Sequence, residues 1–180
     1  RPQCGGEVMD KFRLLEASDI EVKVKQVKKN GAVLLLYKTA RTDMDILDET
    51  VGSENWTNDY REIKGNLYCG IAIREGDAWT WKWDCGIESR EDGEGNEKKG
   101  EASDAFKRAG FRWGIGRELY TAPFIWVPSE KMNILESNGK FRTFDTFSVE
   151  KIAYGDNRRI SGLSILNNRT GKRAFVWAMS

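Results

Sequence analysis

Residues 98–120 constrain the fold of this chain most, because they form its one long stretch with the periodicity of an α-helix. Apolar residues recur there every three or four positions, which places them on one helix face that is expected to pack on a core. Gly114 and Gly116 follow this pattern and predict the end of the helix. The apolar face consists of Ala102, Ala105, Phe106, Ala109 and Trp113.

Three basic residues of this helix point away from its apolar face. At about 100° per residue, Lys107 lies nearly opposite the face, whereas Arg108 and Arg112 lie to one side. Asp104 precedes Arg108 by four residues, so an ion pair within the helix is expected. The pattern predicts a basic flank that is directed toward a partner and not toward the core.

Alternating apolar patterns before this helix predict antiparallel strands. Asn30-Gly31 separates two such runs and predicts a hairpin near the N-terminus. The lysines of its first run are either ordinary solvated surface or the edge of a groove for a nucleic-acid backbone. These lysines are Lys23, Lys25 and Lys28. Three later runs, at 56–64, 67–74 and 78–85, are separated by turn residues and predict a three-stranded meander.

Two shorter helices are expected before the meander. Residues 8–17 have amphipathic spacing, and residues 40–51 form a second amphipathic pattern. Thr42 is the predicted N-cap of the second helix, and Gly52 is its predicted end. Residues 88–96 are acidic, contain glycine and lack periodicity, so they predict a surface loop. The spacing of an EF-hand is absent from that loop, and no metal site is expected there.

The last run of the meander places Trp79, Trp81 and Trp83 on one face of its strand. Aromatic rings beside basic residues can stack the bases of a nucleic acid. Tryptophans at a period of two more commonly form the buried face of a sheet under a helix. We expect the helix at 98–120 to cover them.

After Pro123 the chain is rich in strand patterns. The fold class predicted from all these patterns is α+β. A β-β-β-α core, with the meander packed against the long helix, is joined by the N-terminal hairpin and a β-rich tail. We place the core at residues 1–128 and the tail at 129–180, packed on the same domain. One strand is expected at 124–127, at the end of the core, and the expected strands of the tail are at 132–135, 141–144, 148–154, 160–166 and 173–179.

Composition excludes several classes of protein. The 180-residue chain has a formal net charge of +1, so it is no globally basic nucleic-acid binder, and any such binding must come from local clusters of Lys and Arg. It contains no histidine, which removes Ser-His and Cys-His nucleophile pairs and the commonest zinc ligand. Its three cysteines show no CxxC spacing, which favours a reducing compartment. Neither a signal peptide nor a membrane span is expected.

The sequence lacks the common motifs of nucleotide binding and of catalysis. GxxxxGK[ST], GxSxG and HExxH are absent, and Gly114-Ile115-Gly116 ends a helix where a dinucleotide site would open one. No nucleophile is assembled with a base and an orienting group. The sequence therefore predicts neither a cofactor nor an enzyme, although a nuclease that uses a divalent metal held by carboxylates remains an alternative. Its carboxylates would come from Asp84, Glu88, Glu101 or Asp104.

The succession of a helix, Gly-x-x-x-Trp, a meander and a helix that reads ASDAFKRAGFRWGIG resembles the shared core of the Rad52 family of single-strand annealing proteins. The likeness extends to the members of that family found in bacteria and their phages. It covers residues 38–127 and is carried by three segments. They are residues 40–56, residues 68–86 with Asp84-Cys85-Gly86 at their end, and residues 99–120.

The resemblance implies rings or helical arrays that hold a single strand in a basic outer groove. Lys107 and Arg108 match the paired basic residues of that groove, and Arg41 approximately matches a groove arginine. Arg112 and Lys99 complete the candidate DNA-binding residues. The chain departs from the family at Phe111, where an arginine is frequent, and at Ser53, where some members carry a tyrosine.

The predicted function is ATP-independent binding of single-stranded DNA and annealing of complementary strands in recombination and double-strand break repair. A scaffold that coats a single strand without annealing it is the alternative. The expected partners are DNA, further copies of the chain and a single-strand binding protein, with no membrane. The expected location is the cytoplasm of a bacterial host, at the nucleoid.

Overall fold

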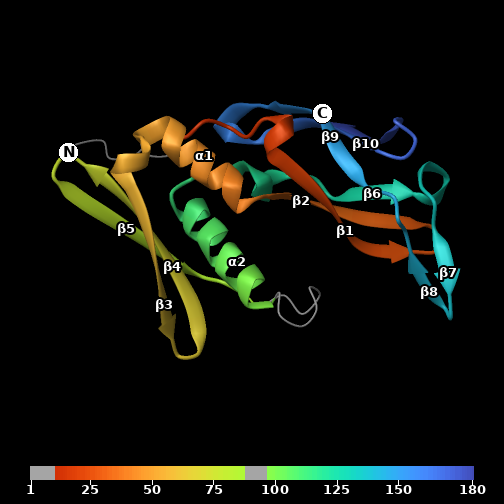
Figure 1. The fold of residues 1–180 in the computed structure, drawn as a ribbon. Coiled ribbons are helices and arrows are strands. Elements are labelled where there is room, and N and C mark those ends of the chain that lie inside the picture. The colour runs from red at the N-terminus through yellow and green to blue at the C-terminus, as the bar shows by residue number, and fades with distance from the viewer. Residues whose placement is uncertain (1–10, 88–96) are drawn as a thin grey trace. The chain divides into compact units, whose positions relative to one another are not determined.

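The computed structural model describes residues 11–87 and 97–180, and the chain divides into two compact units. The described part of unit 1 comprises residues 11–14 and Thr39–Arg117 without 88–96. Unit 2 comprises Leu15–Lys38 and Glu118–Ser180. Antiparallel sheets occur in both units, and the two α-helices of the described residues lie in unit 1 (Figure 1). The predicted α+β class is thereby confirmed.

Helix α1 (Ala40–Val51) opens the main segment of unit 1. Its N-cap is Thr39, whose Oγ1 accepts a hydrogen bond of 3.3 Å from the backbone N–H of Thr42. The predicted N-cap, Thr42, is therefore wrong by three residues, because Thr42 donates the capping bond instead of accepting it. Gly52 ends the helix with a φ of 87°, as predicted.

A three-stranded antiparallel sheet follows α1 in the order β3-β4-β5. It consists of β3 (Trp56–Ile63), β4 (Asn66–Glu75) and β5 (Ala78–Cys85). These bounds lie within one residue of the predicted meander. The register pairs Gly70 with Trp83 and Arg74 with Trp79, so these four side-chain positions share one face of the sheet.

Helix α2 (Glu97–Arg112) packs against β4 and β5. Trp113 follows its last turn and donates its indole N–H to the carbonyl oxygen of Ile71 over 2.9 Å. The rings of Trp56 and Phe106 lie 6.1 Å apart, which fixes α2 on the face of the sheet that carries Trp56. Of the predicted apolar face, Ala105, Phe106, Ala109 and Trp113 are buried, and Ala102 is half-buried. Gly114 and Gly116 have positive φ angles just beyond the helix, as a helix stop requires.

Unit 2 is built on a six-stranded antiparallel sheet in the order β11-β10-β9-β1-β2-β6. Its N-terminal hairpin consists of β1 (Ile20–Lys28) and β2 (Gly31–Lys38). β1 pairs with β9 and β2 pairs with β6, so this sheet joins strands from both sides of the division expected at residue 128. The remaining strands are β6 (Ile125–Pro128), β9 (Phe147–Tyr154), β10 (Ile160–Asn167) and β11 (Arg173–Ala178).

The core of unit 2 lies against this sheet and includes Leu34, Val127 and Ile165. A small hairpin of β7 (Leu135–Ser137) and β8 (Lys140–Arg142) is separate from the six strands. The strands predicted in the tail are thus present, each within three residues of its expected bounds. Short 3₁₀ turns complete the described chain, at Ala17–Asp19, Ser53–Asn55, Arg117–Thr121, Ser129–Lys131 and Asp156–Arg158.

The helix predicted at residues 8–17 is wrong where the structure describes it. Residues 11–16 are not helical, although Phe12 and Leu15 are buried as their spacing indicated. Residues 8–10 and the acidic loop predicted at 88–96 lie outside the described residues. Neither α1 nor α2, the α-helices of the described chain, is long and apolar enough to cross a membrane.

Candidate functional site

The basic flank of α2 carries its charges beside carboxylates. Arg108 Nε lies 2.9 Å from Asp104 Oδ2, which confirms the ion pair expected within the helix. Arg112 Nε lies 3.1 Å from Asp84 Oδ2 on β5. Lys107 is half-buried, so this flank is less open than the sequence predicted.

The two ion pairs reduce the net charge of this flank. Three cations and two carboxylates leave a formal charge of +1. Ion pairs at a surface contribute only about 0–1 kcal/mol each, because water already solvates both partners. A phosphate can therefore replace either carboxylate at small cost.

A further lysine lies beside the end of α2. Lys82 Nζ contacts the carbonyl oxygen of Arg112 at 3.4 Å and lies 4.5 Å from the ring centre of Trp113. Lys82 was not among the predicted site residues, although its place between Trp81 and Trp83 puts it on the opposite face of β5 from the tryptophans.

Arg41 and Lys99 are both exposed, but neither lies in the part of α2 that carries the other candidates. Arg41 lies in the first turn of α1, and Lys99 lies in the first turn of α2. Lys99 precedes Lys107 by eight residues, which is roughly 12 Å along a helix axis. Lys107, Arg108 and Arg112 therefore form the compact part of the predicted set. The β1 lysines of unit 2 are all solvent-exposed.

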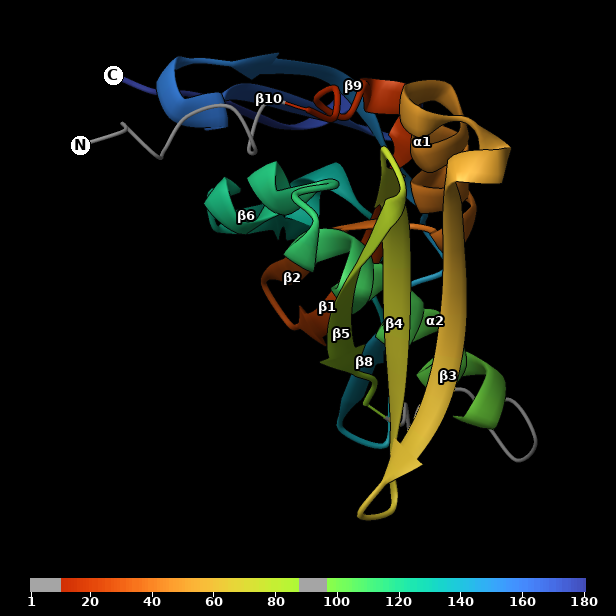
Figure 2. The same cartoon turned by 90° about the vertical axis from the view of Figure 1, so that its left-hand side faces the viewer.

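The tryptophans of β5 lie on the face of the sheet that α2 does not cover. Figure 2 looks onto this face, with α2 behind β4. The prediction that the helix would cover these rings is wrong, because α2 packs on the face of Trp56 and Lys82. We call Trp79, Trp81 and Trp83, with Arg61 and Arg74, the tryptophan face. Trp79 and Trp81 remain 42% and 41% exposed.

Small residues of β4 lie beneath this face. Gly70 and Ala72 pair with Trp83 and Trp81 and are buried, although the rings above them face solvent. A Cβ at position 70 would lie 2.5 Å from the indole of Trp83, so this ring occupies the space of the missing side chain. Trp81 and Trp83 stack with ring centres 5.4 Å apart and planes 17° apart. The rings thus form an ordered surface over the central strand.

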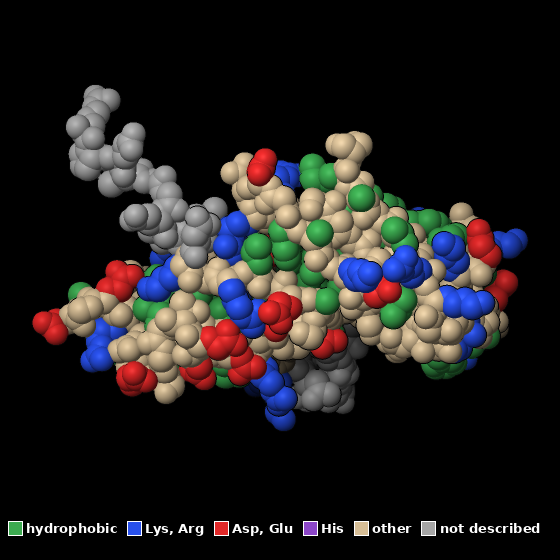
Figure 3. Space-filling view, turned by 90° about the horizontal axis from the view of Figure 1, so that it is seen from above, with side chains coloured by type: hydrophobic (Ala, Val, Ile, Leu, Met, Phe, Trp, Pro, Cys, Tyr) green, Lys and Arg blue, Asp and Glu red, His purple; other side chains and the backbone are tan. Residues whose placement is uncertain are grey.

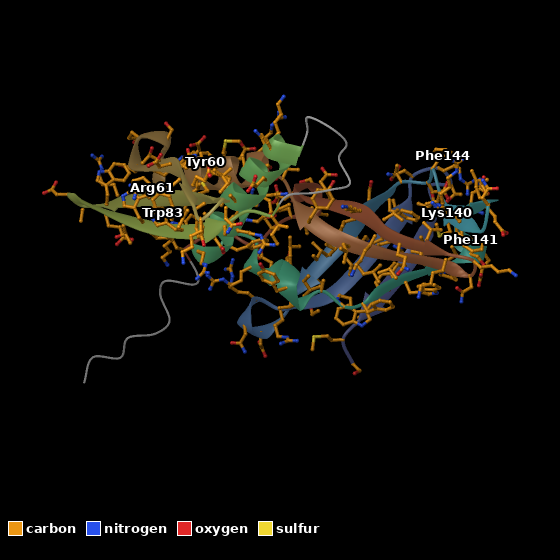
Figure 4. All side chains as sticks on the ribbon, turned by 90° about the horizontal axis from the view of Figure 1, so that it is seen from below. Tyr60, Arg61, Trp83, Lys140, Phe141 and Phe144 are labelled. Atoms are coloured by element: carbon orange, nitrogen blue, oxygen red, sulfur yellow. The ribbon has the colours of Figure 1, made fainter. Side chains whose placement is uncertain are left out.

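An arginine lies over the tryptophan at each end of the row. The guanidinium of Arg61 is 4.9 Å from the ring centre of Trp83, and Figure 4 shows these two side chains together on the sheet. The guanidinium of Arg74 is 5.9 Å from the ring centre of Trp79. Arg74 also donates two hydrogen bonds, of 3.0 and 2.6 Å, to Asn55 Oδ1, which fix its orientation. Cation–π contacts of this kind leave the outer N–H groups of the arginine available for an anion.

The carboxylates considered for a metal-dependent nuclease have other partners. Asp84 and Asp104 pair with arginines, and Glu101 Oε1 accepts a hydrogen bond of 3.3 Å from the backbone N–H of Leu67. The described residues hold no group of three or more acidic or thiol side chains that fits a metal ion, and Glu88 lies outside them. Burial raises the pKa of the Cys69 thiol to about 11 and that of Tyr60 to about 12, so both groups stay neutral at physiological pH.

Unit 2 has its own aromatic and charged groups. The hairpin of β7 and β8 carries Lys140, Phe141 and Arg142, with Phe144 just beyond it (Figure 4). Arg142 lies 5.3 Å from the ring centre of Phe144, which is 76% exposed. These groups form one isolated contact and not a row.

The buried carboxylate of Asp145 in unit 2 accepts hydrogen bonds from segments that lie before and after it in the sequence. It accepts hydrogen bonds from the backbone N–H of Asn133, the amide of Asn167 and the guanidinium of Arg169. The hydrogen bonds from Arg169 above all lower the pKa of Asp145 to about 2. The group is held ionised by structure and has no open side for a ligand, since it is 6% exposed.

Charges of both signs lie among one another on the face seen in Figure 3, in keeping with a net charge of +1. No protein-family model matches this sequence, and no curated protein matches it either.

Proposed function

We propose that this protein binds single-stranded DNA and anneals complementary strands without a nucleotide. The observation that supports the proposal is the succession β3-β4-β5-α2 in unit 1, with α2 packed on one face of the meander. The resemblance of the sequence to the Rad52 family leads us to expect the same order of elements, which is why this succession supports the proposal. Lys107 and Arg108, the residues that match the paired basic positions of that family, lie on the helix of this core.

Phosphate contacts are the chemistry that the flank of α2 can supply. Lys107, Arg108 and Arg112 bind backbone phosphates, and a strand held by its phosphates leaves its base edges available for pairing. Annealing needs no nucleophile, because complementary base pairing selects the product. The protein raises the rate by bringing two strands together with their backbone charge neutralised.

Two or three phosphate contacts in one protomer give weak binding. An assembly of protomers repeats these contacts along one strand, and the linked contacts raise the overall affinity by orders of magnitude. Oligomerisation is therefore part of the proposed mechanism. Binding of a strand also requires that phosphates replace Asp104 and Asp84 as the partners of Arg108 and Arg112.

The decisive experiment measures how fast two complementary, end-labelled oligonucleotides pair in the presence of the protein without nucleotide. The test variant is Lys107→Ala/Arg108→Ala. The matched control is Lys151→Ala/Lys172→Ala, which removes two exposed lysines of unit 2 and the same net charge. We expect acceleration by the wild type and by the control but not by the test variant.

Salt dependence of binding gives a second measure of the same site. Each lost phosphate contact lowers the slope of log K against log salt by roughly 0.7 for a single strand. The double variant should therefore lose up to about 1.4 from this slope. Binding without acceleration would favour the coating scaffold, and cleavage that a chelator abolishes would favour a nuclease. No binding by the folded wild type would refute the proposal.

A further inference from the structure

The tryptophan face of the β3-β4-β5 sheet is a candidate site distinct from the flank of α2. We propose that it binds single-stranded nucleic acid through the bases, which stack on Trp79 and Trp81. The inference rests on the proposed function for the class of ligand, but on different residues. The sheet separates the two sites, because α2 covers one face and the tryptophans stand on the other.

The spacing of the tryptophans fits a flat aromatic ligand. Alternate residues of a strand stand roughly 6.7 Å apart. Trp81 and Trp83 have already closed this distance by stacking on each other at 5.4 Å. Trp79 has no such ring contact with Trp81 among the described side chains. Stacked bases repeat at about 3.4 Å, so one base between two rings needs about twice that distance. The spacing expected for Trp79 and Trp81 on an extended strand matches this requirement.

The surroundings of the rings favour an anionic, aromatic ligand over an aliphatic one. Beneath the row, β4 contributes Gly70 and Ala72, so the strand adds no aliphatic side chain larger than one methyl group there. Arg74 and Arg61 stand at the two ends of the row. Asp59 lies 3.7 Å from Arg61 and offsets one charge, which leaves the face with a formal charge of +1.

A nucleic-acid strand has both an aromatic group for the rings and an anionic group for the arginines. Its bases stack on the exposed indoles, and its phosphates meet the arginines at either end. Stacking on tryptophan is tolerant of sequence because every base has a π-face. The face therefore accepts a single strand of any sequence but not a duplex, in which the bases already stack on each other.

The experiment compares oligo-dT with an abasic strand of the same length and charge. Wild-type protein should bind oligo-dT at least about five-fold more tightly, the smallest effect usual for one stacked base. Trp79→Leu/Trp81→Leu should lose this preference and bind both strands alike. Trp79→Phe keeps a ring and should retain most of the preference. Thr80→Ala, on the opposite face of β5, is the matched control and should leave it unchanged.

Arg61→Gln provides a second variant that leaves every ring in place. Arg61 is exposed, so its loss should not unfold the sheet, and the salt slope of oligo-dT binding should fall by roughly 0.7. Circular dichroism confirms the fold of each variant.

The outcomes separate this inference from the proposed function. If the double tryptophan variant retains the preference for bases, the inference is overturned, whatever the flank of α2 does. If its mass in analytical ultracentrifugation falls while base preference persists, the face joins copies of the chain and the inference is likewise overturned. If Trp79→Leu/Trp81→Leu loses the preference for bases, the inference is supported. If Lys107→Ala/Arg108→Ala then still binds oligo-dT as the wild type does, the proposed site on α2 is contradicted.

Discussion

The two sheets of this protein differ in whether their aromatic side chains pack against a core or face away from the element that covers the sheet. In the six-stranded sheet of unit 2, Phe175 and Trp177 are partly buried and pack against the core of that unit. In the three-stranded sheet of unit 1, Trp79 and Trp81 stand on the face that the helix leaves uncovered. Both sets alternate along a strand at a period of two.

The difference shows that alternation alone does not reveal which face of a sheet is buried. In unit 1 the side chains of β4, the strand that pairs with β5, determine which face the helix covers. β4 directs Cys69, Ile71 and Ile73 to one face and Gly70 and Ala72 to the other. Packing α2 on the aliphatic face buries more apolar area against a helix than the glycine face could offer. The indoles of β5 are left to cover β4 by themselves.

The largest expected effect tests how closely the indoles cover β4. Gly70→Ala should destabilise the protein by about 2 kcal/mol, because the new methyl group overlaps the ring of Trp83. Gly162→Ala on β10 is the matched change in the other sheet. Its methyl group would lie 3.4 Å from the Cβ of Ala153, an ordinary contact, so the protein should keep its stability or gain up to about 1 kcal/mol. Urea denaturation measures both, and equal effects would remove this distinction between the sheets.

A second comparison concerns how the two units hold their carboxylates. Asp145→Asn in unit 2 should cost about 2 kcal/mol, because three donors lose a buried anion. Asp104→Asn in unit 1 removes a half-buried ion pair within one helix and should cost about 1 kcal/mol.

The contribution of Asp145 to the stability of the fold should also depend on pH. Its folded pKa of about 2 lies below the roughly 3.9 of an unfolded aspartate, so ionised Asp145 stabilises the fold above about pH 4. That contribution is lost as the pH falls through 4 toward 2. Denaturation at pH 7 and pH 2.5 should show the difference between the wild type and Asp145→Asn shrinking at the lower pH. A constant difference would contradict the assignment.

The smallest expected effect is a gain in binding. Asp104→Asn removes the carboxylate that competes with phosphate for Arg108, and binding of single-stranded DNA should tighten by up to roughly five-fold. Glu150→Gln releases Arg173 in unit 2 in the same way and should leave DNA binding unchanged. Fluorescence anisotropy with a labelled oligonucleotide measures both. A gain in both variants would indicate an effect of net charge alone.

Much of the fold could be predicted from local signals. Turn residues marked the meander and the hairpins, and the bounds of β5 matched the prediction. Less could be predicted where a distant contact decides. Gly31 appeared to be a turn residue, yet it is the first residue of β2, and a side chain there would collide with Trp126 of β6. Phe12 and Leu15 have helical spacing and are buried without forming a helix. The backbone of Leu15 instead hydrogen-bonds to the side chains of Glu118 and Tyr154, which are distant in sequence.

For the candidate site, the sequence located the helix and its basic residues but not their partners. Asp104 could be paired with Arg108 from spacing, whereas Asp84 reaches Arg112 only through the packing of α2 on β5. The sequence also contains the signal that the tryptophans of β5 are uncovered. The tight turn between β4 and β5 sets the register that places Trp83 opposite Gly70, and a tryptophan beside a glycine needs no helix above it.

The interleaving of the two units along the chain has a consequence for synthesis on the ribosome. The elements of unit 1 are complete once Arg117 has emerged, whereas the six-stranded sheet awaits β11. The β1–β2 hairpin is made early and then stands with both edges unpaired for on the order of ten seconds at usual rates of translation. Unpaired edges invite aggregation, and lysines are the usual protection. Lys23, Lys25 and Lys28 of β1 are exposed, and we expect their charges to oppose aggregation of this hairpin until its neighbouring strands are made.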